Sequence, residues 1–407
     1  MSRQSYAAPP ALAGIQQRSL VVGVVAIVLC AVVGFIAPRG NYFFSAYLIA
    51  YLFLFGLTIG SLAILMMQYM TGGDWGIVIR RNLEAATRTL PLLALAFVPI
   101  LVGIHTLYPW TDATFVNAPG HEVTKHKVLY LNVPFFIGRA IFYFAVWSIL
   151  TYFLNKWSRE QDESADGADV LRRLQVLSGP GLVLYGLTVS FAGIDWIMSL
   201  EPEWFSTIYG MLLMAGQALT ALSLMILTLV YLSKREPLSS FIIPKYVHDL
   251  GKLLLAFVMI WAYLSFSQLL IVWAGDLPNE IPWYLRRLQT NWQWIGLLLA
   301  VFGFAFPFCL LLSRDLKRRA NTIIVIAIIL IVLRFVDLFW LTAPELSPTG
   351  LPGEPLSYLM DVLAPIGLGG IWLAYYIREL RARPLLPLGD PYMDVTAEHV
   401  AEYRHAE

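Results

Sequence analysis

Residues 321–341 read NTIIVIAIILIVLRFVDLFWL, an almost wholly apolar stretch that nevertheless carries Arg334 and Asp337. A helix rises about 1.5 Å per residue, so a stretch of this length crosses the roughly 30 Å hydrocarbon core of a bilayer. Nine further stretches have the same character. The ten predicted spans are 20–37, 45–70, 89–108, 133–154, 177–200, 205–232, 247–274, 293–312, 321–341 and 356–377.

The composition of the chain agrees with a membrane protein. Apolar residues make up 58% of its 407 residues and charged residues only 14%, a balance that a water-soluble domain of this length does not present. We therefore predict an all-α polytopic membrane protein that forms one integral membrane domain over 1–407, with a polar tail over 378–407. The first span exceeds a signal-peptide core and is expected to be retained.

The orientation follows from the basic residues. With ten spans, both termini lie on the same side of the membrane. Of the 28 Lys and Arg residues, twenty-one fall on the side of the termini and five on the opposite side, the other two being Arg139 and Arg334 within spans. Because basic residues favour the cytoplasmic side, we expect both termini, and with them the tail, to be cytoplasmic. Arg286 and Arg287, on the outer side, are expected to face water.

Two segments indicate an internal duplication. FAGIDWIMSLEPEWF (191–205) and LRFVDLFWLTAPELS (333–347) align so that Asp195 matches Asp337, Pro202 matches Pro344, and a glutamate matches a glutamate one residue later. The two spans lie four helices apart and run in the same direction. This spacing predicts two four-helix bundles, spans two to five (45–200) and six to nine (205–342), flanked by spans one and ten. The polar loops 111–132 and 155–174 are the longest, and the second is expected to be a solvated link.

The chain offers little to hold a redox centre. Cys30 and Cys309 stand alone, without the spacings of an iron–sulfur cluster or a covalent c-type haem. No phosphate-binding loop, hydrolytic triad or metal-ligand pattern is found. We therefore expect no catalytic residue, no metal, no covalently bound cofactor and no nucleic-acid partner, with membrane lipid as the ligand to consider.

Ionisable and polar residues within the spans are the candidates for function, because a charge in hydrocarbon costs several kcal/mol unless it is paired or used. They fall into three groups by depth. The outer part of the first bundle has His105, Arg139 and Asp195. The second bundle has Arg334 and Asp337, three residues apart on one helix face, with Ser265 and Gln268 at a similar level. The cytoplasmic end of span seven has His248, Asp249 and Lys252.

Three interpretations of these residues remain open. A histidine beside a carboxylate and an arginine suits a quinol head group, whose hydroxyls are hydrogen-bonded and then deprotonated; this hypothesis takes His105, Arg139 and Asp195 as the site. The second is a proton path through His248, Asp249, Lys252, Ser265, Gln268, Arg334, Asp337 and Asp195. The third is structural, with Arg139–Asp195 and Arg334–Asp337 as buried ion pairs in a membrane scaffold.

Strings along the chain resemble a known family. They include SAYLIAYLFLFGLTIGSLA (45–63), SGPGLVLYGLTVSFAGIDWIMSLEP (178–202), HDLGKLLLAFVMIWAYLSFSQ (248–268), RFVDLFW (334–340) and RPLLPLGDP (383–391). These strings are similar to the NrfD-like, or polysulfide-reductase-type, membrane subunits. Within that family they are similar to the smaller membrane subunit of the quinol:cytochrome c oxidoreductase called Alternative Complex III.

The resemblance implies a place in a respiratory or photosynthetic electron-transport chain of a bacterial inner membrane, with menaquinol as the ligand to consider. It implies an iron–sulfur subunit, c-type haem subunits and a larger NrfD-like subunit as partners, which together carry electrons from menaquinol. It also implies that the smaller subunit contributes proton conduction and assembly. We therefore expect a proton-conducting membrane subunit, with quinol binding at the outer side of the first bundle and a pure scaffold as the alternatives.

Overall fold

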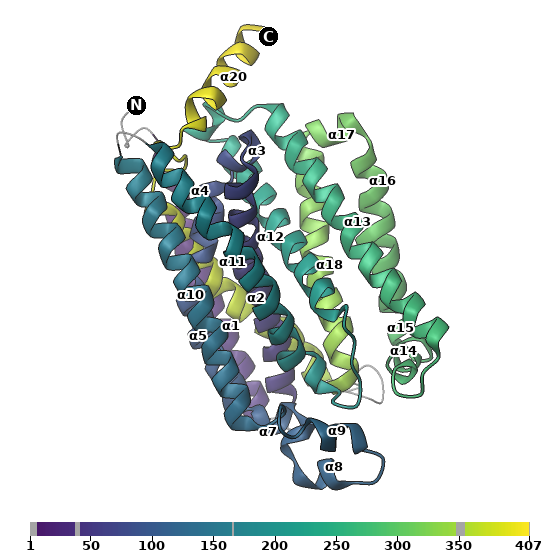
Figure 1. Ribbon diagram of the computed structural model, residues 1–407. Helices are drawn as coiled ribbons and strands as arrows, with labels where there is room; N and C mark the ends of the chain where they lie inside the picture. The colour runs from purple at the N-terminus through teal and green to yellow at the C-terminus, as the bar shows by residue number, and fades with distance from the viewer. Residues whose placement is uncertain (1–5, 37–40, 165–166, 347–354, 407) are drawn as a thin grey trace.

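The computed structural model describes residues 6–36, 41–164, 167–346 and 355–406, and every regular element in them is helical. A helix satisfies all its backbone hydrogen bonds internally, so it is the natural solution for a chain that has lipid as its solvent. Ten helices are long and apolar enough to cross a membrane, and Figure 1 shows them side by side, with the start of α1 and the C-terminal α20 at the same end. The predicted all-α, ten-span fold is confirmed.

Eight of the ten spans contain one long helix each. These are α1 (Ala11–Ile36), α2 (Asn41–Thr71), α10 (Val133–Glu163), α11 (Gly167–Trp196), α12 (Tyr209–Ser233), α13 (Pro244–Gly275), α18 (Ala320–Leu346) and α19 (Pro355–Arg381).

The third span is a chain of short helical segments. It consists of α4 (Arg80–Thr87), α5 (Leu90–Ala96), α6 (Val98–Val102) and α7 (Ile104–Leu107). Pro91 and Pro99 stand in the first turns of α5 and α6. A proline has no backbone N–H and clashes with the preceding turn, so each one interrupts the regular helix.

The eighth span changes its winding midway. It runs from α15 (Trp292–Leu298) through the π-helix η5 (Leu299–Ala305) to α16 (Phe306–Leu312). A π-helical turn is rare and often marks a functional position.

Short helices form the connections at the two ends of the molecule. They are α3 (Asp74–Ile77), η2 (Pro109–Thr111), α8 (Ala113–Asn117), α9 (Glu122–Lys127), η3 (Met198–Leu200), η4 (Leu238–Ser240), α14 (Ile281–Leu288) and α17 (Arg314–Arg318), with α20 (Tyr392–Ala406) in the C-terminal tail.

Helices α2 and α12 form the centre of the molecule. In their most apolar windows 94% and 83% of the residues are buried, against at most 50% in the other eight spans. Both pack against α11 and α18. Helix α2 also packs against α4 and α12 against α13, so the two halves of the chain make corresponding contacts. The division into two four-helix bundles remains a prediction.

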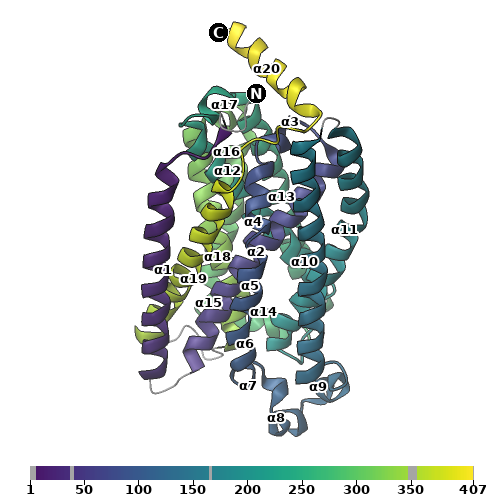
Figure 2. The same cartoon turned by 90° about the vertical axis from the view of Figure 1, so that its left-hand side faces the viewer.

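Helices α1 and α19 lie together on one side of the molecule (Figure 2). Glycines let them approach closely: a Cβ on Gly23 would lie 2.6 Å from the backbone nitrogen of Ile371, and one on Gly370 would lie 2.7 Å from Cα of Gly23. Small residues are the usual means of bringing membrane helices into backbone contact.

The expected loop over 155–174 is largely helical, and only part of it is solvated. Helix α10 continues to Glu163 and α11 begins at Gly167, so most of that segment is helical. Ser158 and Gln161 are buried there rather than solvated, because they contact charged residues of α4 and of the tail, which are far away in the sequence.

Candidate functional site

Arg139 of α10 and Asp195 of α11 form a saturated ion pair. Nε of Arg139 lies 2.8 Å from Oδ2 of Asp195, and Nη2 lies 2.9 Å from Oδ1. The Tyr143 hydroxyl donates to Oδ2 at 2.8 Å, and Nη1 of Arg139 donates to the Tyr130 carbonyl at 2.9 Å. Both carboxylate oxygens therefore have partners, and the pair joins α10 to α11 as a clamp.

His105 does not join this pair. Its side chain is exposed on α7, whereas Asp195 is fully buried. Among the described residues none makes a hydrogen bond or an ion pair with His105. The expected convergence of His105, Arg139 and Asp195 is therefore absent from the structure, because the broken third span places His105 on the outside of the molecule.

The second pair, Arg334 and Asp337 of α18, is buried but incompletely satisfied. Nη1 of Arg334 lies 2.7 Å from Oδ2 of Asp337. The groups are not aligned as a hydrogen bond, so Oδ2 of Asp337 and both Nε and Nη1 of Arg334 have no hydrogen-bond partner among the described residues. The guanidinium also lies 5.4 Å from the centre of the Trp261 ring. Asp337 is 4% exposed, as is Arg334. Both ion pairs are therefore buried, and they differ in how many of their polar atoms have hydrogen-bond partners.

A cavity of about 530 Å³ lies beside Asp337. Helices α13, α14 and α18, together with α15 and η5, supply most of its walls, which are mainly aromatic and aliphatic. Ser265 and Gln268 are among the residues that line it. Gln268 is 2% exposed, and neither its amide oxygen nor its amide nitrogen has a hydrogen-bond partner in the described chain. The structure thus brings together three of the predicted proton-path residues, Ser265, Gln268 and Asp337, with Arg334 directly behind them.

Three more of the predicted proton-path residues, His248, Asp249 and Lys252, lie at the opposite end of α13, and the last, Asp195, lies on α11. Asp249 contacts Lys252 at 2.9 Å and Nδ1 of His248 at 3.6 Å. Between Lys252 and Ser265 the helix runs for about 20 Å. The residues between them, LLLAFVMIWAYL, carry one hydroxyl and one indole N–H. The group of His248, Asp249 and Lys252 is therefore separate from the group around Asp337.

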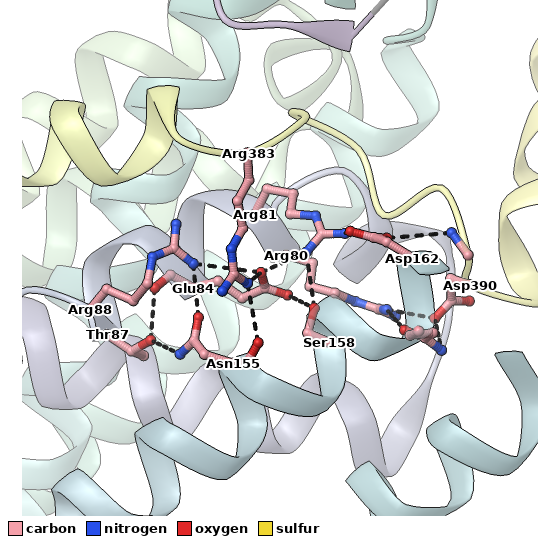
Figure 3. A network of polar contacts seen from close by, with 12 residues as sticks. Arg80, Arg81, Glu84, Thr87, Arg88, Asn155, Ser158, Asp162, Arg383 and Asp390 are labelled. Atoms are coloured by element: carbon pink, nitrogen blue, oxygen red, sulfur yellow. Dashed lines mark hydrogen bonds and ion pairs between the residues drawn. The ribbon is translucent and has the colours of Figure 1, made fainter. Parts of the chain in front are cut away.

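A third polar cluster lies at the end of the molecule that carries α20, and Figure 3 shows it. Glu84 is its centre: it accepts from Arg81 at 2.8 Å and from Ser158 at 2.6 Å, and it lies 3.3 Å from Arg383 and 3.8 Å from Arg88. Arg81 also pairs with Asp162.

The same cluster fastens the tail. Arg80 lies 2.5 Å from Asp390, and Arg88 lies 3.0 Å from Glu379. Arg80 and Asp390 are buried. The cluster contains four arginines and four carboxylates, so its formal charge is zero; they are Arg80, Arg81, Arg88 and Arg383 with Glu84, Asp162, Glu379 and Asp390. Balanced charges at the ends of helices indicate a structural clasp between α4, α10 and the tail.

At the opposite end, Arg287 is completely buried, so the expectation that it faces water is wrong. It lies 2.9 Å from Glu345 and donates to the carbonyl oxygen of Leu341 at 2.9 Å. Arg286 pairs with Glu345 and lies 2.9 Å from Glu201. Burial, followed by the hydrogen bond and charge of Glu345, raises the pKa of Glu201 to about 7, which Arg286 only partly opposes.

The internal duplication pointed to Glu345 in the sequence, but it did not predict that this glutamate pairs with Arg286 and Arg287. Glu345 stands one residue after Pro344 in the segment that aligns with the end of the fifth span. The aligned residue there, Glu203, accepts from Thr124 in the loop 111–132. Both glutamates therefore hold a loop segment to the end of a span.

Comparison with models of known protein families finds no match, and comparison with curated proteins finds no similar sequence. The structural and chemical observations above therefore carry the functional proposal, together with the resemblance of the sequence strings.

Proposed function

We propose that this multi-pass membrane protein is the smaller NrfD-like subunit of a quinol-oxidising complex of the Alternative Complex III type. It would lie in a bacterial inner membrane and take part in a respiratory or photosynthetic electron-transport chain. Its partners would be an iron–sulfur subunit, c-type haem subunits and a larger NrfD-like subunit, which carry the electrons. The strings quoted above support this placement.

Within such a complex we assign to this chain a proton-conducting role centred on Asp337. The observation that carries this assignment is the contrast between the two buried ion pairs. Asp195 has both oxygens hydrogen-bonded, whereas Oδ2 of Asp337 lies 2.7 Å from Arg334 without an aligned hydrogen bond, and Asp337 lines a cavity. A carboxylate held at membrane depth with an incomplete set of hydrogen bonds and space beside it is suited to exchange a proton with water or a ligand.

The surroundings of Asp337 supply the other parts of a proton relay. Gln268 and Ser265 line the same cavity and offer amide and hydroxyl groups. Arg334 supplies a positive charge 2.7 Å from the carboxylate, so it stabilises the deprotonated form after the proton leaves. His248, Asp249 and Lys252 would form the cytoplasmic entrance, and water would have to bridge the apolar stretch of α13 between them and Ser265.

The test is the ratio of protons released on the outer side to electrons transferred, measured in vesicles that contain the purified complex. Asp337→Asn removes the titrating group and keeps the shape, so we expect assembly and haem reduction to persist while the ratio falls. An unchanged ratio would leave a structural scaffold as the function of this chain.

A further inference from the structure

The short helix α17 joins two membrane spans, one that ends at Leu312 and one that begins at Ala320. Figure 1 shows it at the end of the molecule that carries α20, beside α16 and α18. Only residues 313–319 separate the two spans, so α17 lies at the surface of the bilayer, at the level of the lipid head groups. Its side chains are therefore within reach of lipid phosphates.

This connection is strongly basic. It carries one acidic residue, Asp315, and four basic residues, so its formal charge is +3; the basic residues are Arg314, Lys317, Arg318 and Arg319. None of the four makes an ion pair with an acidic side chain of the described residues. By contrast, each of the four arginines in the cluster around Glu84 pairs with a carboxylate. The positive charge of the connection is thus left for a partner outside this chain.

Lys317 is the best-defined of these cations. It is 9% exposed, although a lysine is rarely buried without an acidic partner. Gly251 of α13 makes this burial possible: a Cβ on Gly251 would lie 3.1 Å from Cγ of Lys317, so the stem of the lysine lies directly against the backbone of α13. The lysine is held in a shaped position between two elements and is not a free surface side chain.

Other positive charges surround Lys317. His248 of α13 interacts electrostatically with Lys252 of its own helix, and likewise with Lys317 and Arg318 of α17. Asp249 also acts on His248, but its carboxylate already lies 2.9 Å from Lys252. Like charges that gather in this way repel one another unless an anion lies among them.

The surface below these charges is apolar. Leu312 and Phe306 of α16 are 57% and 41% exposed, and α16 packs against α13. Both helices belong to membrane spans, so this surface faces hydrocarbon. A small soluble anion would use the charges and leave the apolar surface to other molecules. An anionic lipid matches both parts, with its phosphate at the charges and its chains along the helices.

We propose that Lys317 and Arg318, with Lys252 beside them, bind the phosphate of an anionic phospholipid whose acyl chains lie along α16 and α13. The phosphate oxygens accept hydrogen bonds from the ammonium and guanidinium groups, and charge strengthens these bonds. Basic pockets between membrane helices are suited to anionic lipid head groups. This site is distinct from the cavity beside Asp337, and it does not depend on the proton-conducting role.

The test is native mass spectrometry of the purified full-length chain, titrated in detergent with dioleoylphosphatidylglycerol or with dioleoylphosphatidylcholine. The wild type should bind phosphatidylglycerol saturably and more tightly than phosphatidylcholine. Lys317→Gln with Arg318→Gln removes two charges, each of which contributes about fivefold in affinity. The affinity of this double variant for phosphatidylglycerol should therefore fall about tenfold or more.

Two further variants separate the site from general attraction to a positive surface. Arg159 of α10 and Arg172 of α11 are exposed, so Arg159→Gln with Arg172→Gln removes the same number of charges elsewhere and should bind as the wild type does. Arg318→Lys keeps the charge and should retain most of the binding. If Lys317→Gln prevents folding, Arg318→Gln alone, at an exposed position, should still weaken binding about fivefold.

Three results would overturn the site. They are equal weakening by the two double variants, equal affinity of the wild type for the two lipids, and displacement of phosphatidylglycerol by an excess of inorganic phosphate, which would assign the position to a free anion. Because no proton release is measured, such a failure leaves the proton-conducting proposal to its own test.

Discussion

At the scale of single residues, the two buried ion pairs show how neighbours decide what a charge does. Arg139 reaches Asp195 from another helix, so two nitrogens and the Tyr143 hydroxyl all point at the carboxylate. Arg334 reaches Asp337 along the same helix, three residues away, where the geometry allows a close approach but no aligned hydrogen bond. The first pair is rigid and complete; the second leaves capacity for a proton or a ligand.

Gly216 of α12 makes room for the second pair. A Cβ at this position would lie 1.9 Å from Nη2 of Arg334, so Gly216→Ala forces the guanidinium away from its place. We expect a loss of about 1–3 kcal/mol in stability from this overpacking, visible as a lower midpoint of thermal unfolding in detergent. Gly186→Ala is the control, because its Cβ would meet only the Met214 sulfur, at 4.0 Å. Equal midpoints for the two variants would contradict this close packing.

Glu201 predicts a dependence of stability on pH. Its pKa rises from 4.5 to about 7 on folding, so between these values the folded chain holds a proton that the unfolded chain has released. The contribution of Glu201 to stability therefore falls as the pH rises from about 4.5 to about 7 and is constant on either side. In Glu201→Gln the midpoint of thermal unfolding should depend less on pH over this window than in the wild type. A variant that kept the full slope would show that another group titrates there.

At the scale of elements, the polar cluster around Glu84 ties the tail to the helices. Arg80 of α4 and Asp390 of the tail are 310 residues apart in the sequence and lie 2.5 Å apart in the fold. Asp390→Asn leaves the Arg80 charge buried without its main partner, which costs about 3–5 kcal/mol. We expect faster proteolysis of the segment after Arg381 in this variant.

The double variant Arg80→Gln with Asp390→Asn tests the same contact as a pair. Because it removes both charges, it should recover part of the protection that Asp390→Asn loses. If the protection lost in the double variant equalled the sum of the losses in Arg80→Gln and Asp390→Asn, the two side chains would not interact.

Hydropathy located all ten spans because lipid is a uniform solvent and the length of a span is set by the bilayer. The pairing of Arg334 with Asp337 was predictable because it is local, and that of Arg139 with Asp195 because both lie at one depth. The polar cluster around Glu84 was not predictable, since no sequence pattern links Arg80 with Asp390. The exposure of His105 depends on the broken path of α4–α7. Estimating the depth of a residue from its position in the sequence assumes one straight helix.

The burial of Arg287 could not be predicted for the same reason, because its partners are far away in the sequence. Arg287 follows Arg286 in a loop segment, where basic residues usually face water, and its burial depends on Glu345 from α18 and on the ring of Trp283, which lies 3.4 Å from the guanidinium carbon. No spacing within the loop itself indicates that contact. The cavity beside Asp337 likewise requires α13, α14, α15, η5 and α18 to be placed before it exists.

At the scale of the whole molecule, the distribution of basic residues predicts which end is cytoplasmic. α20 and the start of α1 lie at one end of the molecule (Figure 1), and twenty-one of the 28 Lys and Arg residues belong to the side of the termini. A green fluorescent protein fused to the C-terminus should therefore fluoresce, and a phosphatase that needs export should be inactive there. Fusions of the same two reporters after Pro119, in the outer loop, should give the opposite pattern. A reversed result would place the cavity beside Asp337 in the cytoplasmic leaflet.

The most direct measurement for the account as a whole is the number of protons released per electron by vesicles that contain the assembled complex, compared between Asp337→Asn and Asp195→Asn. Asp337→Asn should lower the ratio while the complex still assembles and transfers electrons, because the incompletely bonded carboxylate is the group that exchanges protons. Asp195→Asn should lower stability and leave the ratio unchanged in the complexes that form. A wild-type ratio in Asp337→Asn would contradict the central claim.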